Sequence, residues 1–232
     1  MKKVAFFDID GTVFRSSLFI ELVEGCIAEE VFPKEAKEKY AQEYNAWLNR
    51  EGSYEAYINA VIASFMEHIR GVYYGDFADI GRMVVAKQGK QTYRYTRDLI
   101  QDLRGQGYYI VAISQSPKTI LDEFCAGYGF DKVYGRLYEL GPRDLFTGEV
   151  TNSELISNKA LVVDRVLEKE GLTLEDSIGV GDTEGDIPLL ASVAVPICFN
   201  PNKALYTYAQ EKEWQVVVER KDVIYTMPGN TM

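Results

Sequence analysis

The chain has 232 residues, of which 47% are apolar and 26% are charged, proportions that are ordinary for a globular protein with a sizeable core. Its 35 acidic residues outnumber the 25 basic ones, and the net charge is −10. This balance argues against nucleic acid or an anionic membrane as the main partner, because both reward a basic surface. A small anionic substrate is compatible with it, since a small site sets its own local charge.

Targeting signals, disulfides and histidine chemistry are not indicated. The apolar run after Lys3 is too short for a signal peptide, and no stretch approaches the ~20 residues of a membrane span. The three cysteines, at positions 26, 125 and 198, form neither a zinc pattern nor a disulfide framework, so we expect a reducing, cytoplasmic setting. Any His-based site would depend on the single histidine, His68, whereas sites made of oxygen ligands are unrestricted.

In chain order, a short apolar strand over residues 3–7 comes first and leads directly into two aspartates, Asp8 and Asp10. Residues 15–86 then show only helical periodicity, with apolar side chains three and four positions apart. From residue 87 onward, helices alternate with short apolar runs. We expect strands at 109–114, 177–181, 195–199 and 215–218, helices at 117–128, 158–170 and 186–191, and a β-hairpin arm centred on Thr147 and Gly148.

This alternation predicts an α/β fold, with a doubly wound, mostly parallel sheet. The helical block separates the first strand from all the others. The simplest architecture is therefore an α/β core formed by residues 1–14 and 87–232, with an all-helical cap inserted as residues 15–86.

Four polar stretches fall where predicted strands end or where the adjoining helix begins, and an open parallel sheet carries its binding site at that edge. They are DIDGT at 8–12, SQ at 114–115, a lysine at 159, and GDTEGD at 181–186. The first stretch does not fit an EF-hand. An EF-hand loop has glycine at its sixth position, whereas the glycine of DIDGT is the fourth residue. Each of the other stretches is weak alone, but their joint occurrence indicates a phosphate site.

The residue types in these stretches suit phosphoryl transfer. One carboxylate can attack phosphorus and form an aspartyl-phosphate, and a second can protonate the leaving oxygen and then deprotonate water. Ser114 can hydrogen-bond a phosphoryl oxygen, and Lys159 can neutralise its charge. Carboxylates that converge on an anion need a hard cation, and Mg²⁺ prefers oxygen ligands. We therefore expect Mg²⁺ as the cofactor and a small phosphate ester as the substrate.

The four stretches resemble the motifs of the haloacid dehalogenase superfamily, specifically its phosphoserine-phosphatase-like branch, and they follow the family's order. The likeness covers essentially the whole chain. It implies a Rossmann-like core, with Asp8 as the nucleophile and Asp10 as the general acid/base, assisted by Ser114 and Lys159. The helical insertion directly after the first motif also matches this branch.

The same resemblance implies the remaining site residues. Mg²⁺ would be held by Asp8, the backbone carbonyl of Asp10, and Asp182, while Asp186 would support the metal shell or orient Lys159. The residues expected to bind phosphate or substrate are Gly11, Thr12, Arg15, Ser114, Gln115 and Lys159.

One departure from the family pattern concerns the substrate. Phosphoserine phosphatases carry an acidic residue a few positions after the first motif, and this chain has Ser16 and Ser17 there. Another phosphomonoester is therefore at least as good an expectation as phosphoserine.

Two alternatives to hydrolysis are open. A phosphotransferase or phosphomutase would use the same residues and pass the phosphoryl group to an alcohol, depending on how well the cap excludes water. A non-catalytic phosphate-binding module would be marked by the loss of a catalytic position, and all of these positions are present. The sequence favours a Mg²⁺-dependent phosphatase.

Overall fold

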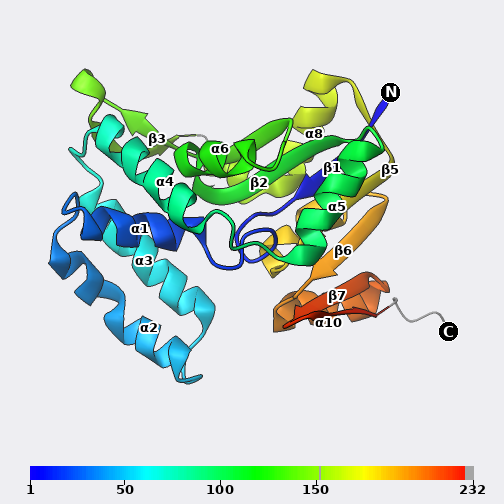
Figure 1. The fold of residues 1–232 in the computed structure, drawn as a ribbon, viewed down its shortest axis with the longest axis horizontal. Helices are drawn as coiled ribbons and strands as arrows, with labels where there is room; N and C mark the ends of the chain where they lie inside the picture. Colours follow the sequence, from blue (N-terminus) through cyan, green and yellow to red (C-terminus); the bar gives the residue numbers. More distant parts are fainter. Residues whose placement is uncertain (152, 228–232) are drawn as a thin grey trace.

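The computed structural model describes residues 1–151 and 153–227, and a single sheet runs through its centre (Figure 1). Its eight strands lie in the order β4-β3-β2-β1-β5-β6-β7-β8. The strands are β1 (Lys2–Phe7), β2 (Tyr109–Pro117), β3 (Lys132–Leu140), β4 (Phe146–Thr151), β5 (Leu172–Gly181), β6 (Val195–Phe199), β7 (Gln215–Arg220) and β8 (Val223–Met227). Neighbouring strands are parallel from β3 to β7, and the two edge strands are antiparallel. The predicted α/β fold with a mostly parallel sheet is confirmed.

Helices cover both faces of this sheet, as the alternation of side chains along β1 requires. Ala5 and Phe7 join a core cluster with residues of α5 and α6, whereas Val4 and Phe6 pack with residues of α8. The helices outside the β1–β2 connection are α5 (Arg94–Gly105), α6 (Lys118–Ala126), α7 (Ser153–Ser157), α8 (Lys159–Glu170), α9 (Ile187–Leu190) and α10 (Lys203–Lys212). Because both faces are covered, residues 4–7 of β1 are apolar and buried, and the polar site residues follow at its carboxyl end.

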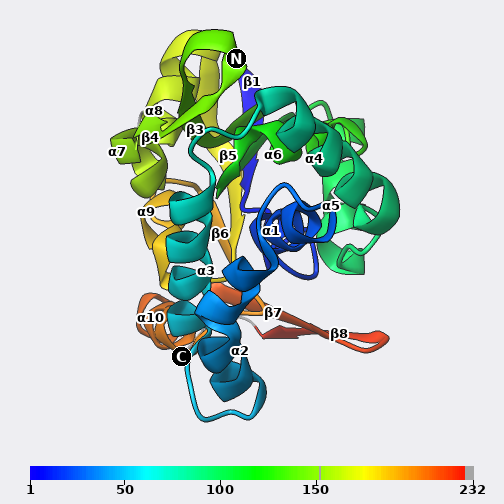
Figure 2. The same ribbon diagram turned by 90° about the vertical axis from the view of Figure 1, so that its left-hand side faces the viewer.

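The chain between β1 and β2 is helical, and these helices lie together on one side of the sheet (Figures 1 and 2). They are α1 (Leu18–Ala28), α2 (Ala41–Leu48), α3 (Tyr54–His68) and α4 (Tyr74–Gln88), with a 3₁₀ helix at Lys34–Tyr40. Serine side chains cap two of them, Ser17 at α1 and Ser53 at α3, by accepting a backbone N–H of the first turn. The division into a core and a separate cap is still a prediction, since residues of α1, α3 and α4 share one apolar cluster with the sheet.

The stretch that leads into this helical segment and the stretch that leads out of it lie next to each other. The Arg15 N–H donates to the Gln91 carbonyl at 2.9 Å, and the Tyr93 N–H donates to the Val13 carbonyl at 3.0 Å. The two connecting stretches are therefore tied to each other at the edge of the sheet.

The structure differs from the sequence-based expectations in the hairpin and in two strands, β3 and β8, that were not anticipated. The hairpin exists, but its turn is at residues 141–145, and Thr147 and Gly148 lie inside β4. Arg143 and Asp144 take the left-handed backbone conformation of that turn, with φ of 61° and 56°. The edge strand β8 was not anticipated, because it is almost entirely exposed and so has no buried periodicity. The other predicted strands and helices are present, with bounds that shift at their ends.

Two further observations concern the helices and cysteines. In residues 1–151 and 153–227, every helix is too short or too polar to cross a lipid bilayer. All three cysteines are free and buried, as expected for small apolar core residues.

Phe65 of α3 connects the helical segment to the sheet, so its truncation tests how strongly the two are coupled. Its ring is fully buried and lies 5.1 Å from the rings of Phe19 in α1 and Tyr138 in β3, centroid to centroid. We expect Phe65→Ala to lower the free energy of unfolding by about 3–5 kcal/mol in urea denaturation. Tyr225→Ala, on the exposed edge strand, should change it by less than about 0.5 kcal/mol. Similar values for the two variants would contradict the coupling.

Candidate active site

A buried lysine between two carboxylates forms the centre of the site. Lys159 lies in the first turn of α8, which Asn158 caps, and its Nζ is 2.5 Å from both Asp8 Oδ1 and Asp186 Oδ1. The side chain is buried, and a buried cation without partners would cost several kcal/mol. Burial lowers the pKa of Lys159, but the charges of Asp186 and Asp8 outweigh it and hold this pKa above its ordinary value. The lysine is therefore charged and held between the two carboxylates.

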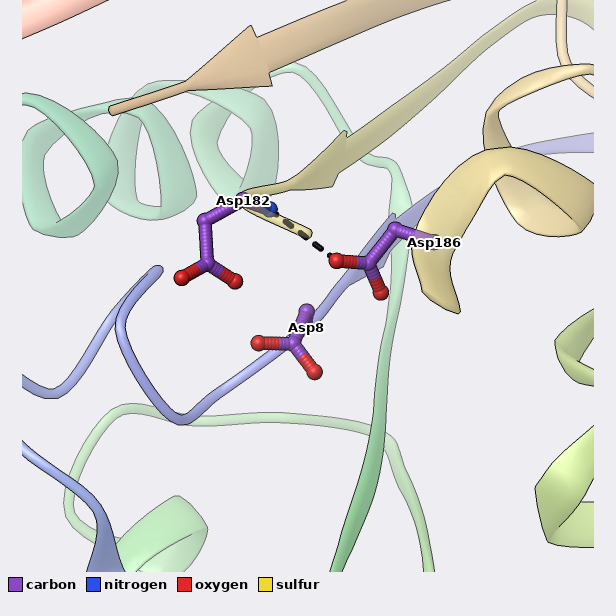
Figure 3. A group of neighbouring side chains, drawn as sticks. All are labelled: Asp8, Asp182 and Asp186. Atoms are coloured by element: carbon purple, nitrogen blue, oxygen red, sulfur yellow. Dashed lines mark hydrogen bonds between the residues drawn. The ribbon is translucent and has the colours of Figure 1, made fainter. Parts of the chain in front are cut away.

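Three aspartates, Asp8, Asp182 and Asp186, lie close together at the strand ends (Figure 3). Asp8 follows β1, while Asp182 and Asp186 follow β5, and each offers a carboxylate oxygen within 4.8 Å of the others. The Asp182 and Thr183 N–H groups both donate to Asp186 Oδ2 at 3.0 Å. Both oxygens of Asp186 are thus occupied, one by backbone and one by Lys159, so in this structure it orients the lysine and the loop.

The cluster carries more negative charge than its contacts neutralise. Burial is the largest cause that raises the pKa of Asp8, Lys159 opposes it, and with the charges of Asp186 and Asp10 the result is a pKa of about 7. Burial also raises the pKa of Asp182 well above its ordinary value, and the charges of Asp8 and Asp186 add to the shift. Three carboxylates face one bound ammonium group here. An all-oxygen cluster with unmet negative charge fits Mg²⁺, and Asp8 and Asp182 are the side chains that would hold it.

The turn after Asp8 shapes the position of Asp182. Gly11 has φ of +80°, and its N–H donates to the carbonyls of Phe14 and Ser16 at 3.0 Å. A Cβ at this position would overlap Asp182 Oδ2. Thr12 is buried and donates its hydroxyl to Asp182 Oδ1 at 3.2 Å. These two residues, expected beside the phosphate, position a carboxylate in this structure.

Asp10 points to a different set of partners from Asp8. Its Oδ2 accepts from the Ser114 hydroxyl at 2.5 Å and from the Ser116 hydroxyl at 2.8 Å, and its Oδ1 accepts from the Leu18 N–H at 2.5 Å. Asp10 therefore ties the end of β2 to the first turn of α1. Its carboxylate is not part of the acid cluster, and metal ligation by its backbone carbonyl is still a prediction.

Ser116, which also donates to Asp10, was not among the site residues predicted from the sequence. Strand alternation places Ser114 and Ser116 on one face of β2, so the spacing within SQSP was the available signal. Between them, Gln115 is exposed, and its Oε1 accepts from Arg136 Nη2 at 2.7 Å. The contact with Arg136 had no sequence signal, because β3 was not anticipated.

Arg15 lies at the start of the helical segment and makes no ion pair with the acid cluster. Its side chain is exposed, and its guanidinium carbon is 5.8 Å from the centroid of the Tyr93 ring. The described contacts bring together Asp8, Lys159, Asp182 and Asp186, then Asp10 with Ser114, and leave Gln115 and Arg15 at the periphery.

The comparisons with known proteins agree with this arrangement. Residues 5–191 match the haloacid dehalogenase-like hydrolase family, so the chain belongs to that family. It is 24% identical over 216 residues to a phosphoserine phosphatase of Mycobacterium tuberculosis strain H37Rv, which covers 91% of this chain and 69% of that protein. It is 23% identical over 226 residues to a histidinol-phosphatase of Neisseria meningitidis serogroup C, which covers 94% of this chain and 99% of that protein.

A solved structure shows the same fold. A protein of unknown function from Bordetella pertussis Tohama I superimposes with a TM-score of 0.73 at 19% identity, over 93% of this chain and 98% of that one. The resemblance seen in the sequence, including the phosphoserine-phosphatase-like branch, is confirmed by these matches. The expected enzyme class, a phosphoric monoester hydrolase, agrees with the names of the two relatives.

A pair of glycine variants separates the close approach at Gly11 from its backbone conformation. Gly11 and Gly171 both have positive φ, at +80° and +61°, but a Cβ at Gly171 would meet nothing within 4 Å. Alanine at a left-handed position costs about 1–2 kcal/mol in either place. We expect added Mg²⁺ to raise the melting temperature of Gly171→Ala but not that of Gly11→Ala, because only the latter displaces Asp182. Equal responses of the two variants to Mg²⁺ would contradict the role given to Gly11.

Proposed function

We propose that this haloacid dehalogenase-like hydrolase is a Mg²⁺-dependent phosphatase that acts on a small phosphomonoester through an aspartyl-phosphate on Asp8. The observation that carries the proposal is the buried group of Asp8, Lys159, Asp182 and Asp186 at the carboxyl ends of β1 and β5. A nucleophile, a fixed cation and a metal-binding pair of carboxylates are the parts that phosphoryl transfer needs. The relatives named above support this class of ester, and they differ in the alcohol that they release.

In the first step, Asp8 attacks phosphorus. A carboxylate oxygen of Asp8 forms a bond to phosphorus while the bond to the ester oxygen breaks. Lys159, already within 2.5 Å of Asp8, would contact the phosphoryl oxygens and offset their charge. When bound, Mg²⁺ would add positive charge at the same oxygens. The proton for the leaving alcohol comes from Asp10, whose orientation is set by Ser114, Ser116 and the Leu18 amide.

In the second step, the aspartyl-phosphate is hydrolysed. Asp10, now ionised, takes a proton from water as the water oxygen bonds to phosphorus, and Asp8 is released as a carboxylate. Transfer to an alcohol would follow the same path with the alcohol in place of water. Measuring free phosphate against phosphorylated acceptor separates the two outcomes.

The proposal includes a cytoplasmic setting for the enzyme. Its free, buried cysteines are compatible with that setting.

The nucleophile is tested with a generic aryl phosphate. We expect Mg²⁺-dependent release of phosphate by the unaltered chain and at least ~10³-fold lower kcat for Asp8→Asn, because an amide cannot form the acyl-phosphate. Asp164→Asn, an exposed carboxylate on the same helix as Lys159, is the matched control and should keep full activity. Retention of activity in Asp8→Asn, in a preparation free of contaminating phosphatases, would refute the proposal.

The metal site predicts a pH-dependent response to Mg²⁺. The pKa of Asp8 is about 7 in the folded chain, above that of an unfolded aspartate, so protonation of Asp8 stabilises the metal-free protein below pH 7 and this contribution is lost as pH rises through 7. Mg²⁺ binds the ionised form, so we expect the melting temperature to rise more on Mg²⁺ addition at pH 8 than at pH 6.

Thermal unfolding with and without Mg²⁺ at the two pH values measures this difference. Asp182→Asn is the control, because it removes one of the two proposed ligands and should abolish the gain at pH 8. The same Mg²⁺ response at both pH values, or an unchanged response in Asp182→Asn, would count against the metal site.

A further inference from the structure

Two serine hydroxyls share one oxygen of Asp10. Ser114 and Ser116 both donate to Asp10 Oδ2, at 2.5 Å and 2.8 Å, while Oδ1 accepts from the Leu18 N–H at 2.5 Å. Both serines are buried, with 0% and 3% of their surface exposed. Asp10 is thus held by three donors, and two of them come from the end of β2.

The order of residues at the end of β2 keeps both hydroxyls on the side of Asp10. Successive side chains of a strand alternate, so Ser114 and Ser116 face one way and Gln115 the other. Pro117 follows directly, and the residue before a proline is confined to extended backbone. Ser116 is therefore kept out of α6, which begins at the next residue after the proline, and its side chain stays aligned with that of Ser114.

Each serine has a single hydroxyl hydrogen to donate, and this limits what the two can do. Ser114 Oγ accepts from the Ser116 N–H at 2.9 Å and gives its own hydrogen to Asp10. To donate to a phosphoryl oxygen, as expected of it from the sequence, Ser114 must release Asp10. The Ser116 hydroxyl has Asp10 as its one partner among the described residues, so the same exchange is not required of it.

The bond from Ser116 is needed because one donor does not fix a carboxyl group. With the Leu18 N–H alone on Oδ1, the carboxyl group of Asp10 can pivot about that bond and move Oδ2. A second donor on Oδ2 fixes the plane of the group. In catalysis, a displacement of about 1 Å in a reacting group can cost ~10²-fold in rate.

We propose that the two serines divide these tasks: Ser114 turns to the phosphate when the ester binds, and Ser116 is the positioning residue that keeps Asp10 directed at the leaving oxygen. This inference rests on the proposed phosphatase function and adds a residue that acts through Asp10 rather than on the substrate. As Asp8 bonds to phosphorus and the ester bond breaks, the leaving oxygen takes the proton from Asp10, which Ser116 holds in place.

The test uses two esters whose leaving oxygens need this proton to different degrees. Dinitrophenolate is a weak base that departs without a proton, whereas the alkoxide of glycerol phosphate must be protonated. The value of kcat/KM covers the steps up to the departure of the alcohol, so it isolates this proton transfer from the later attack of water. We expect Ser116→Ala to lower kcat/KM for glycerol phosphate about tenfold more than for dinitrophenyl phosphate. Ser116→Thr, which retains the hydroxyl, should restore the ratio of the unaltered chain.

Two further variants make the comparison specific. Ser114→Ala loses a contact to the phosphoryl group, which the two esters share, so we expect it to lower both values by the same factor. Ser64→Ala is the matched control, because Ser64 in α3 is 1% exposed and also donates at 2.8 Å, to the Ala36 carbonyl. It should leave the ratio of the two values unchanged, as would a purely structural role for Ser116.

The exchange of partners is observed directly in a crystal structure of the unaltered protein with Mg²⁺ and inorganic phosphate. We expect Ser114 Oγ within about 3 Å of a phosphate oxygen and Ser116 Oγ still bonded to Asp10. Bound phosphate that contacts Ser116 instead, or that leaves both serines on Asp10, would overturn the division of tasks.

The kinetic outcomes separate this inference from the proposed function. If the unaltered chain hydrolyses both esters and Ser116→Ala changes both values by the same factor, the inference is wrong and the phosphatase function stands. A selective loss for glycerol phosphate in Ser114→Ala, and not in Ser116→Ala, overturns the inference in the same way. If the unaltered chain hydrolyses neither ester, the proposed function is refuted and the inference with it.

Discussion

The site is organised by the burial of Lys159 between Asp8 and Asp186. A buried ammonium group is tolerated only with close, well-oriented anions, and both carboxylates lie 2.5 Å from it. This constraint acts on three elements at once, because the lysine begins α8, Asp8 directly follows β1, and Asp186 lies in the loop after β5. The central strands and α8 must therefore be in register before the charges can be satisfied. The same register places Asp182 beside Asp8, as the proposed metal site requires.

The two aspartates of the first motif serve different neighbours although only one residue separates them. Asp8 continues the direction of β1 toward Lys159, whereas the turn that Gly11 permits brings Asp10 to the hydroxyls of Ser114 and Ser116. Asp10 is also bound by the Leu18 amide of α1. The proposed proton donor is thus held jointly by the sheet and by the helical segment, while the proposed nucleophile is held by the sheet side alone.

The sequence predicted those strands and helices whose buried apolar residues recur at the spacing of a strand or a helix. The central strands and α8 are apolar runs or amphipathic patterns, and the four polar stretches follow them directly, so their convergence followed from sheet topology. Exposed elements gave no such signal, and β8 and the turn at residues 141–145 were missed or misplaced for that reason. Individual contacts were also beyond the pattern. Two examples are the hydrogen bond from Ser116 to Asp10 and the close approach of Gly11 to Asp182. Both depend on the backbone path of the turn after Asp8 rather than on residue type.

The paired stretches at the base of the helical segment have a consequence for how such proteins diversify. Because Arg15 bonds to Gln91 and Tyr93 bonds to Val13, the entry and exit of the segment are fixed next to each other by the chain around them. The entropy of closing the connection between β1 and β2 is therefore compensated at its base, and the length and composition of the helices in between can vary at low cost to the sheet. Selection can then exchange the surface of the helical segment while the residues of the proposed phosphate site stay the same. A difference such as serine for an acidic residue at positions 16 and 17 would be the visible trace of such an exchange.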